Sequence, residues 1–239
     1  MSESWRAFWS GYRTGPAASE ADLFVQVGKT VSREPVPLLV FREMVQQVVD
    51  GLDLQSTDHL VDLCCGNGLI THALAHLVEQ ITAIDFAEHL IDSALRFKAK
   101  ANIRYCVGDV ETALSREVKR PPDKVLMNDS LGYFTPESFG LVLDSVLALT
   151  QDLPMQFLVT GVPAYALRWS FYDTPERRMR FMALEQEGGD TFDGMGRWWR
   201  EDELREIGAL RRLDVEIAPQ SPALSEYRIN VAYRQRGTP

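Results

Sequence analysis

An acidic residue and two glycines lie close together in residues 61–68, which read VDLCCGNG. Asp62 lies within an apolar run, and Gly66 and Gly68 follow that run. Because glycine has no Cβ, these two positions let the backbone come close to a ligand. In a doubly wound sheet, ligands bind at such turns, outside the carboxyl ends of the strands. The sequence therefore predicts a ligand site at this turn.

Three more polar residues each follow a later apolar run, namely Asp85, Asp109 and Asn128. Asp85 comes 23 residues after Asp62, and an acid about 20 residues beyond the glycine turn binds the ribose hydroxyls in nucleotide-binding folds. An Asp after a strand is also a common turn former or helix N-cap. Four polar strand ends in this order nevertheless favour one ligand site along this edge of the sheet.

Residues 58–160 resemble the class I S-adenosylmethionine (SAM)-dependent methyltransferases, whose first motif is an acidic residue followed by alternating glycines. Asp62 matches the acid, and Gly66 and Gly68 match the last two glycines. Cys64 stands where many members have the first glycine. The resemblance implies that SAM is the cofactor and that this turn binds it. The implied contacts at the turn are Asp62, Cys64, Gly66, Asn67 and Gly68.

The resemblance also assigns roles to the later strand ends. It implies that Asp85 binds the ribose hydroxyls, with Phe86 against one face of adenine. Asp109, followed by Val110, matches the position that accepts from the adenine amino group. Asn128 lies where family members line the methionine part of SAM.

Methyl transfer from a sulfonium needs the nucleophile, the methyl carbon and the sulfur in line, with water excluded. Few catalytic groups are obligatory, although a hydroxyl acceptor benefits from a general base. The candidates that can orient or deprotonate an acceptor are Asp129 and Tyr133, in the loop after the fourth strand. Asp129 can instead bind backbone amides, and Tyr133 can instead belong to the core. Of the four histidines, only His72 starts close enough to the turn for a role in the site.

Aromatic residues near the N-terminus recur at helical spacing, namely Trp5, Phe8, Trp9 and Tyr12. Such a segment either packs on the domain as an amphipathic helix or, as in many members of this family, folds over the cofactor. Tyr12 is the predicted contact with SAM. The polar stretch that can border the same pocket consists of Gln26, Gly28, Lys29 and Thr30.

Residues 161–199 are too long for an ordinary connection of about 2–6 residues. We expect this insertion to roof the substrate pocket and to bend at its glycine pair, 188 and 189. Trp198 and Trp199 either stack against a flat acceptor or belong to a small core of the insertion. Its aromatic residues are Tyr165, Trp169, Phe171, Tyr172, Phe181, Phe192, Trp198 and Trp199. The arginines expected to meet an acceptor carboxylate or phosphate are Arg168, Arg177 and Arg197.

Apolar runs and helical patterns alternate along the chain, and their order decides the expected fold. The predicted strands are residues 59–65, 81–86, 103–108, 124–128, 156–159, 211–218 and 227–233. The predicted helices are residues 36–50, 69–77, 90–97, 135–149 and 201–207. Alternating strands and helices imply a mainly parallel sheet with helices on both faces. No helix separates the last two strands, so we expect a Rossmann-like α/β fold whose seven-stranded sheet has an antiparallel hairpin at one edge.

A chain of 239 residues without a repeat or a linker fits one domain. We divide it into an N-terminal helical cap (1–57), a SAM-binding core (58–160), the substrate-side insertion (161–199) and a C-terminal helix with the edge strands (200–239). The three cysteines lack the spacing of metal ligands. We therefore expect buried, reduced thiols in strand-like surroundings and no metal site.

The net charge of −9 disfavours nucleic acid as a partner, because binding to a phosphate backbone needs clustered Lys and Arg. No stretch approaches the roughly 20 apolar residues of a membrane span, so we expect a cytoplasmic protein; a homo-oligomer is left open. The expected activity is SAM-dependent methylation of oxygen or nitrogen in a small molecule, such as a sugar or secondary metabolite. One alternative is a non-catalytic SAM-binding regulatory or structural partner. The other is a nicotinamide dehydrogenase, whose fingerprint needs a third glycine where this chain has Thr71.

Overall fold

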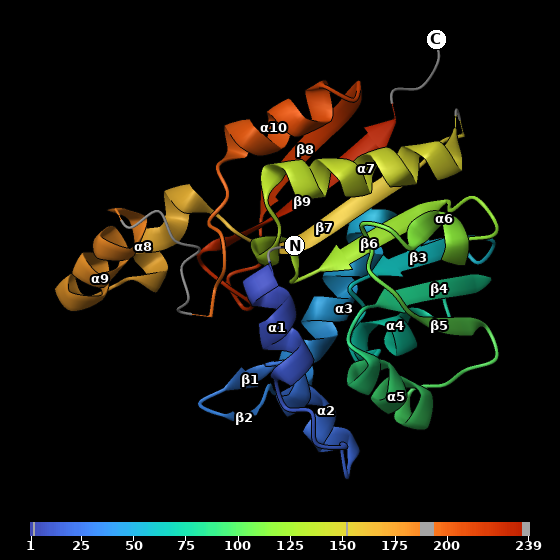
Figure 1. The fold of residues 1–239 in the computed structure, drawn as a ribbon, viewed down its shortest axis with the longest axis horizontal. Coiled ribbons are helices and arrows are strands. Elements are labelled where there is room, and N and C mark those ends of the chain that lie inside the picture. Colours follow the sequence, from blue (N-terminus) through green and yellow to red (C-terminus); the bar gives the residue numbers. More distant parts are fainter. Residues whose placement is uncertain (2, 152, 187–193, 236–239) are drawn as a thin grey trace.

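A computed structural model describes residues 1, 3–151, 153–186 and 194–235 of the chain. In these residues a mixed seven-stranded sheet has the order β5-β4-β3-β6-β7-β9-β8 (Figure 1). The strands from β5 to β7 are parallel, and β9 runs antiparallel to both β7 and β8. This arrangement confirms the predicted fold and its edge hairpin. The strands are β3 (His59–Leu63), β4 (Gln80–Asp85), β5 (Ile103–Val107), β6 (Lys124–Asn128), β7 (Gln156–Pro163), β8 (Leu213–Pro219) and β9 (Arg228–Gln235).

Helices cover both faces of the sheet. On one face lie α3 (Leu38–Leu52), α4 (Leu69–Leu74) and α5 (Glu88–Phe97), and on the other lie α6 (Leu114–Glu117), α7 (Pro136–Thr150) and α10 (Glu201–Ala209). Successive strand residues point to opposite faces. Leu60 therefore packs with α3 and α4, whereas Val61 packs with α6, α7 and α10. Burial on both faces explains why the central strands read as continuous apolar runs.

At two strand ends the difference from the sequence prediction has a clear backbone cause. β3 ends at Leu63, because Cys64 has a φ of 58°, which is a left-handed conformation that strands do not contain. β7 continues to Pro163, because its last residues pair with β9 after a β-bulge between Val159 and Val162. The alternating pattern of apolar residues does not reveal either event.

The segments before α3 lie next to the carboxyl ends of the central strands (Figure 1). They comprise α1 (Glu3–Gly11), α2 (Glu20–Gln26) and a small hairpin of β1 (Thr30–Val31) and β2 (Glu34–Pro35). The sequence analysis missed α2, although Ser19 and Asp22 form a capping box at its start. The pattern Ser-x-x-Asp was the available signal. In the described part of the chain, no helix is long and apolar enough to cross a membrane.

The segment after β7 stands out from the sheet (Figure 1). It contains the short helices η2 (Tyr165–Leu167) and α8 (Arg168–Phe171), and the longer α9 (Pro175–Gln186). Its buried aromatic core includes Phe181 and Trp198, in agreement with one of the two predicted roles of Trp198. Trp199 belongs to the main core and donates from Nε1 to the Leu131 carbonyl at 3.1 Å, so neither of the two roles predicted for it, stacking on an acceptor or packing in a small core of the insertion, is correct. Residues 188, 189 and Phe192 lie outside the described residues.

Candidate active site

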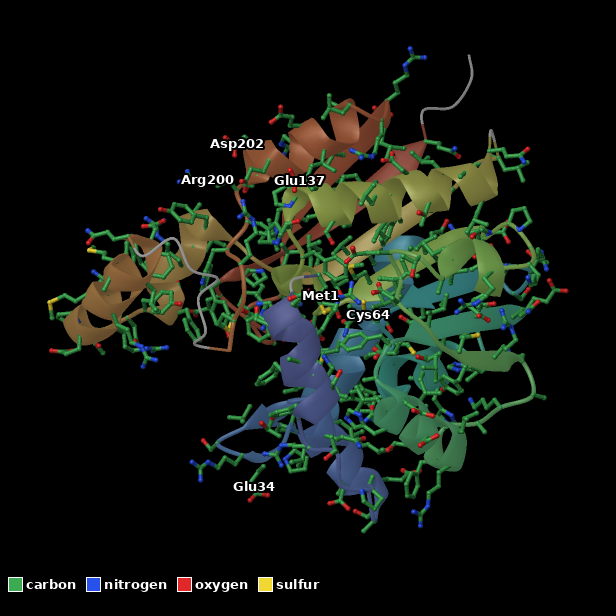
Figure 2. All side chains as sticks on the ribbon, in the orientation of Figure 1. Met1, Glu34, Cys64, Glu137, Arg200 and Asp202 are labelled. Carbon is green, nitrogen blue, oxygen red and sulfur yellow. The ribbon has the colours of Figure 1, made fainter. Side chains whose placement is uncertain are left out.

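A cavity of ≈590 Å³ opens at the carboxyl ends of the central parallel strands. Residues that follow β3, β4 and β6 line it, together with α1, α3 and residues 27–31. β9 runs the opposite way, so its first residue, Arg228, reaches the same edge of the sheet and lines the cavity too. Figure 2 labels two other lining residues, Met1 and Cys64, near the centre of the view. The fold thus gathers residues far apart in sequence around one space.

The turn after β3 has a left-handed backbone, with φ values of 58° at Cys64, 56° at Gly66 and 75° at Gly68. The residues of β3 and of this turn that line the cavity are Asp62, Cys64, Cys65, Gly66 and Asn67. Gly68 is not among the lining residues. A Cβ at Gly68 would lie 2.4 Å from the hydroxyl oxygen of Tyr105. This glycine therefore makes room for Tyr105, and close approach of a ligand depends on Gly66.

Two buried carboxyl groups, Asp62 and Asp85, lie under this turn. Burial raises the pKa of Asp62 to about 7, although the Thr71 hydroxyl, which donates to its Oδ2 at 2.6 Å, lowers that pKa. Burial also raises the pKa of Asp85. The backbone N–H groups of Gly66 and Ala87 donate to the Asp85 carboxylate at 2.8 and 2.9 Å. Asp85 lines the cavity and keeps acceptor capacity, since a carboxylate offers about four lone-pair sites.

Asp109 and Val110 do not line the cavity, whereas Phe86 does. The Asp109 carboxylate pairs with Arg6 of α1 and accepts from the Glu111 N–H at 2.9 Å. Val110 is buried in the main core. In this structure Asp109 therefore holds α1 against the domain. Its contact with adenine, and that of Val110, stay predictions.

Asn67 ties the glycine turn to α2. Its Nδ2 donates to the Leu23 carbonyl at 2.8 Å and to Gln26 Oε1 at 3.0 Å. Its buried Oδ1 has no hydrogen-bond partner among the described residues. A buried polar atom without a partner costs about 1–3 kcal/mol, so a ligand donor at Oδ1 would be stabilising. Gln26 donates to Ser93 at 3.1 Å and does not itself line the cavity.

α1 combines the two roles that the sequence left open. Trp5 is buried, and its ring centroid lies 4.7 Å from that of Tyr133. Phe8, Trp9 and Tyr12 line the cavity. The helix thus packs on the core with one side and covers the cavity with another.

The loop after β6 places Asp129 between two cations. Its Oδ1 accepts from Nη1 of Arg228 at 2.7 Å, and its Oδ2 accepts from Nζ of Lys29. Burial acts to raise the pKa of this carboxyl, but the charges of Lys29 and Arg228 outweigh burial and hold the pKa below its usual range. Asp129 is therefore ionised and a weak base. Such a group suits the positioning of an acceptor better than its deprotonation.

Tyr133 and Asn128 flank Asp129 and also line the cavity. Tyr133 ends a short helix, η1 (Leu131–Tyr133), and burial raises its pKa to about 12. Its hydroxyl therefore stays protonated at neutral pH and can donate a hydrogen bond. Asn128 is fixed by the Thr160 hydroxyl, which donates to its Oδ1 at 2.8 Å.

The insertion's arginines do not line the cavity, contrary to expectation. Arg177 and Arg197 form ion pairs with neighbouring carboxylates, and Arg168 stacks on an aromatic ring of the insertion at 3.8 Å from its centroid. Among the described residues, the side-chain cations that line the cavity are Lys29 and Arg228. Sequence reasoning named Lys29 but missed Arg228, whose position at the start of an apolar run belongs to no motif.

Residues 60–152 match the model of a family described as a methyltransferase domain. The matched segment contains the glycine turn, Asp85 and the Asn128–Tyr133 loop, which the fold brings to one cavity. This segment is a methyltransferase domain. The methyltransferase family uses SAM as its cofactor, which agrees with the cofactor predicted from the sequence.

Solved methyltransferases share the fold over nearly the whole chain. For a SAM-dependent methyltransferase from Clostridium acetobutylicum, the TM-score is 0.62 at 15% identity, over 90% of this chain and 99% of that one. For magnesium protoporphyrin IX methyltransferase from Synechocystis, with S-adenosylhomocysteine (SAH) bound, the TM-score is 0.57 at 15% identity, over 98% and 95%. At this level of identity the likeness concerns the fold alone.

Two curated relatives from Streptococcus pneumoniae, both named as uncharacterized RNA methyltransferases, are 28% identical to this chain over 128 residues. The aligned part is 46% of this chain and 28% of each relative. The chain thus spans well under half the length of these relatives. They support the methyltransferase domain and leave the acceptor open.

The cavity of the methyltransferase domain fits SAM in size and in chemistry. Its volume of ≈590 Å³ lies within the range of about 300–1,000 Å³ for small-molecule sites. The Asp85 carboxylate provides an acceptor for hydroxyl groups, and the unpartnered Oδ1 of Asn67 provides one for an N–H group. Phe86 and Leu90 add apolar surface beside Asp85.

The cysteines differ partly from expectation. All three are free, and Cys106 is buried in β5 as predicted. Cys64 and Cys65 instead lie in the turn after β3 and line the cavity. Burial raises the pKa of both thiols well above the usual value, so they stay protonated. Within the described residues, no group of His, Cys, Asp and Glu is arranged to hold a metal ion.

Proposed function

We propose that the chain is a SAM-dependent methyltransferase that methylates oxygen or nitrogen of a small molecule, such as a sugar or a secondary metabolite. The supporting observation is the extent of one cavity, which runs from Asp85 and Phe86 after β4 to Asp129 and Arg228 beyond it. The first end suits the adenosine part of the cofactor. The second end leaves space for an acceptor beside the transferable methyl group.

Bound SAM supplies a methyl group on a positively charged sulfur, and the acceptor displaces that sulfur in line. The chain's residues orient the partners and exclude water. Asp85 accepts hydrogen bonds from the ribose hydroxyls, and the protonated Tyr133 hydroxyl donates one to the acceptor. The ionised carboxylate of Asp129 positions the acceptor. Trp9 and the rest of α1 exclude water. With no strong base at Asp129 or Tyr133, an acceptor that arrives deprotonated is favoured.

Calorimetry with SAM, followed by detection of SAH and methylated product across a metabolite panel, tests the proposal. Saturable SAM binding with turnover of one or more small molecules is the expected result. Binding without turnover of any acceptor would favour a non-catalytic SAM-binding partner. Failure of the wild-type protein to bind SAM or SAH would exclude both functions.

RNA is a second candidate acceptor because of the names of the Streptococcus pneumoniae relatives. The net charge of −9 opposes binding to a phosphate backbone, which becomes weaker still as salt is raised. Incubating the protein with labelled SAM and a mixed RNA pool at low and at moderate salt distinguishes the two. Label incorporated into RNA at both salt concentrations would replace the small-molecule assignment.

The division into four segments and the predicted contacts of individual residues with SAM are parts of this proposal. The cytoplasmic location and the open question of a homo-oligomer likewise stay predictions from the sequence.

A further inference from the structure

Two cations and one carboxylate form a compact cluster at the end of the cavity beyond β6. Lys29 comes from the segment after α2, Asp129 from the loop after β6, and Arg228 from β9. The side chain of Lys29 is 10% exposed, and that of Arg228 is 22% exposed. All three residues line the cavity. The cluster therefore carries a net charge of +1 in a largely desolvated position.

The backbone around Asp129 is shaped to hold this cluster. Gly161 forms part of the bulge in β7 and has a φ of 69°. A Cβ there would lie 1.7 Å from Oδ1 of Asp129 and 3.2 Å from Nη1 of Arg228. Asp129 itself has a φ of 53°, a conformation that costs a residue other than glycine free energy. Bulges that redirect side chains are common next to active sites.

Both cations have donors beyond those that Asp129 uses. The two hydrogen bonds of Arg228 to Asp129 and to the Gly161 carbonyl, at 2.7 and 2.9 Å, come from Nη1. The Tyr227 side chain is a further hydrogen-bond partner of Arg228. A guanidinium has five N–H donors and an ammonium has three. Donors of Arg228 and of Lys29 therefore remain for a ligand in the cavity that both residues line.

The cluster lies away from the predicted ribose site. In the sheet, β3, β6 and β7 lie between β4 and β9. Neighbouring strands are about 4.8 Å apart. Four such steps place Arg228 about 19 Å along the sheet from Asp85. The acidic residues Asp62 and Asp85 belong to the β3–β4 end of the cavity, whereas the net positive charge belongs to the end that faces the acceptor.

From this charge distribution we infer that the acceptor carries an anionic group, a carboxylate or a phosphate, which binds between Lys29 and Arg228. The inference rests on the proposed function and adds the chemical class of its substrate. A buried cation without a compensating anion is unfavourable, and an anionic acceptor group removes that cost. Asp129 limits the excess charge of the two cations to one.

Benzoate and benzamide are matched probes, because they share a shape and differ in charge. Each is titrated by calorimetry into wild-type protein saturated with SAH. We expect benzoate to bind at least about tenfold more tightly than benzamide, the scale of one charge-assisted hydrogen bond. Equal affinities, or no saturable benzoate binding in the millimolar range, would overturn the inference. Failure of SAH to bind would instead contradict the proposed function.

Substitutions at the cluster give effects of opposite sign. Arg228→Gln and Lys29→Gln should each weaken benzoate binding about tenfold, whereas Asp129→Asn should strengthen it severalfold, because it leaves both cations uncompensated. Arg234→Gln is the matched control, since Arg234 lies on the same strand and pairs with the exposed Glu216. The control should bind benzoate as wild type does. Weaker benzoate binding by Asp129→Asn would overturn the inference even if Arg228→Gln failed to fold.

The affinity for SAH in the same variants shows which ligand the cations hold. We expect Arg228→Gln and Lys29→Gln to bind SAH within about threefold of wild type, a change worth less than 1 kcal/mol. If both variants lost SAH binding together with benzoate binding, the cations would hold the carboxylate of the cofactor. That outcome would overturn an anionic acceptor while leaving the methyltransferase proposal in place.

Discussion

At the scale of single residues, the carboxyl groups of the site differ because their surroundings differ. Asp62 is buried with one hydroxyl donor, and its pKa rises to about 7. Asp129 is held between Lys29 and Arg228, and its pKa falls. Both carboxyls are buried, and of the two, Asp129 has the neighbouring cations whose charge outweighs burial and keeps it ionised at neutral pH.

The substitution Asp85→Ala should weaken SAM binding by about 1–3 kcal/mol, the scale for losing charge-assisted hydrogen bonds to a carboxylate. Calorimetric titration with SAM measures the change. Asp92→Ala, an exposed position on α5, is the matched control and should bind SAM as wild type does. Unchanged affinity in Asp85→Ala would mean that the end of β4 does not hold the ribose.

The substitution Asp62→Asn should change how stability depends on pH. The pKa of Asp62 is about 7 in the folded protein and about 3.9 in an unfolded chain. The raised pKa therefore gives its full contribution to stability below about pH 4. Between about pH 4 and pH 7 this contribution falls by about 1.4 kcal/mol per pH unit. Asparagine cannot ionise, so Asp62→Asn should gain stability relative to wild type over that range.

Urea unfolding of both proteins between pH 4 and pH 8 measures this difference. The exposed Asp53, changed to Asn, serves as the control and should show no such trend. A stability difference between Asp62→Asn and wild type that stays constant with pH would contradict a raised pKa for Asp62.

At the scale of elements, the bulge in β7 connects the fold to the site. The bulge shifts the register between Val159 and Val162, and Gly161 leaves space for the Asp129 carboxylate. β7 thus pairs with its neighbouring strands and also leaves the space in which Asp129 and Arg228 form their ion pair. The turn after β3 works similarly, since Gly66 opens toward the cavity while Gly68 packs against Tyr105.

The substitution Gly161→Ala should destabilise the protein by about 2–4 kcal/mol, because it adds a Cβ at a positive φ and against Asp129. Chemical denaturation measures the free energy of unfolding. Gly15→Ala is the control, since a Cβ at Gly15 meets no atom within 4 Å; its effect should stay within about 0.5 kcal/mol. Equal stability of the two variants would show that the Asp129 cluster can move without cost.

At the scale of the whole molecule, the protruding segment after β7 has an aromatic core separate from the main core. Tyr172, Phe181 and Trp198 form the smaller core, while Trp199 belongs to the larger one. Most ring contacts of the smaller core join residues of this same segment, between Tyr165 and Trp198. Segments of this kind open at a lower free energy than the sheet that carries them.

The substitution Phe181→Ala should therefore open this segment without unfolding the sheet. Amide hydrogen exchange should become at least about tenfold faster in α9, since deleting a buried Phe costs about 3–5 kcal/mol, and stay unchanged in β3 and β6. Met179→Ala, at a position that is 63% exposed, should leave exchange unchanged in both regions. Faster exchange in the central strands of Phe181→Ala would show that the two cores unfold together.

The sequence by itself determined the order of strands and helices, the edge hairpin and the residues at the ends of β3, β4 and β6. These features are local, because apolar runs, periodicity and glycine turns act over a few residues. The same local signals place Asp62, Asp85, Asn128 and Asp129 at one edge, since parallel strands end together. They also favoured a helix for the aromatic residues near the N-terminus.

Only the tertiary structure decided which residues share the cavity and in what charge state. Arg228 is 99 positions from Asp129, and an antiparallel strand with a bulge brings the two together. Asp109 forms an ion pair with Arg6 of α1. The insertion's arginines pair with local carboxylates or stack on an aromatic ring. These pairings depend on contacts between distant segments, and on burial that shifts each pKa, so no local pattern in the sequence encodes them.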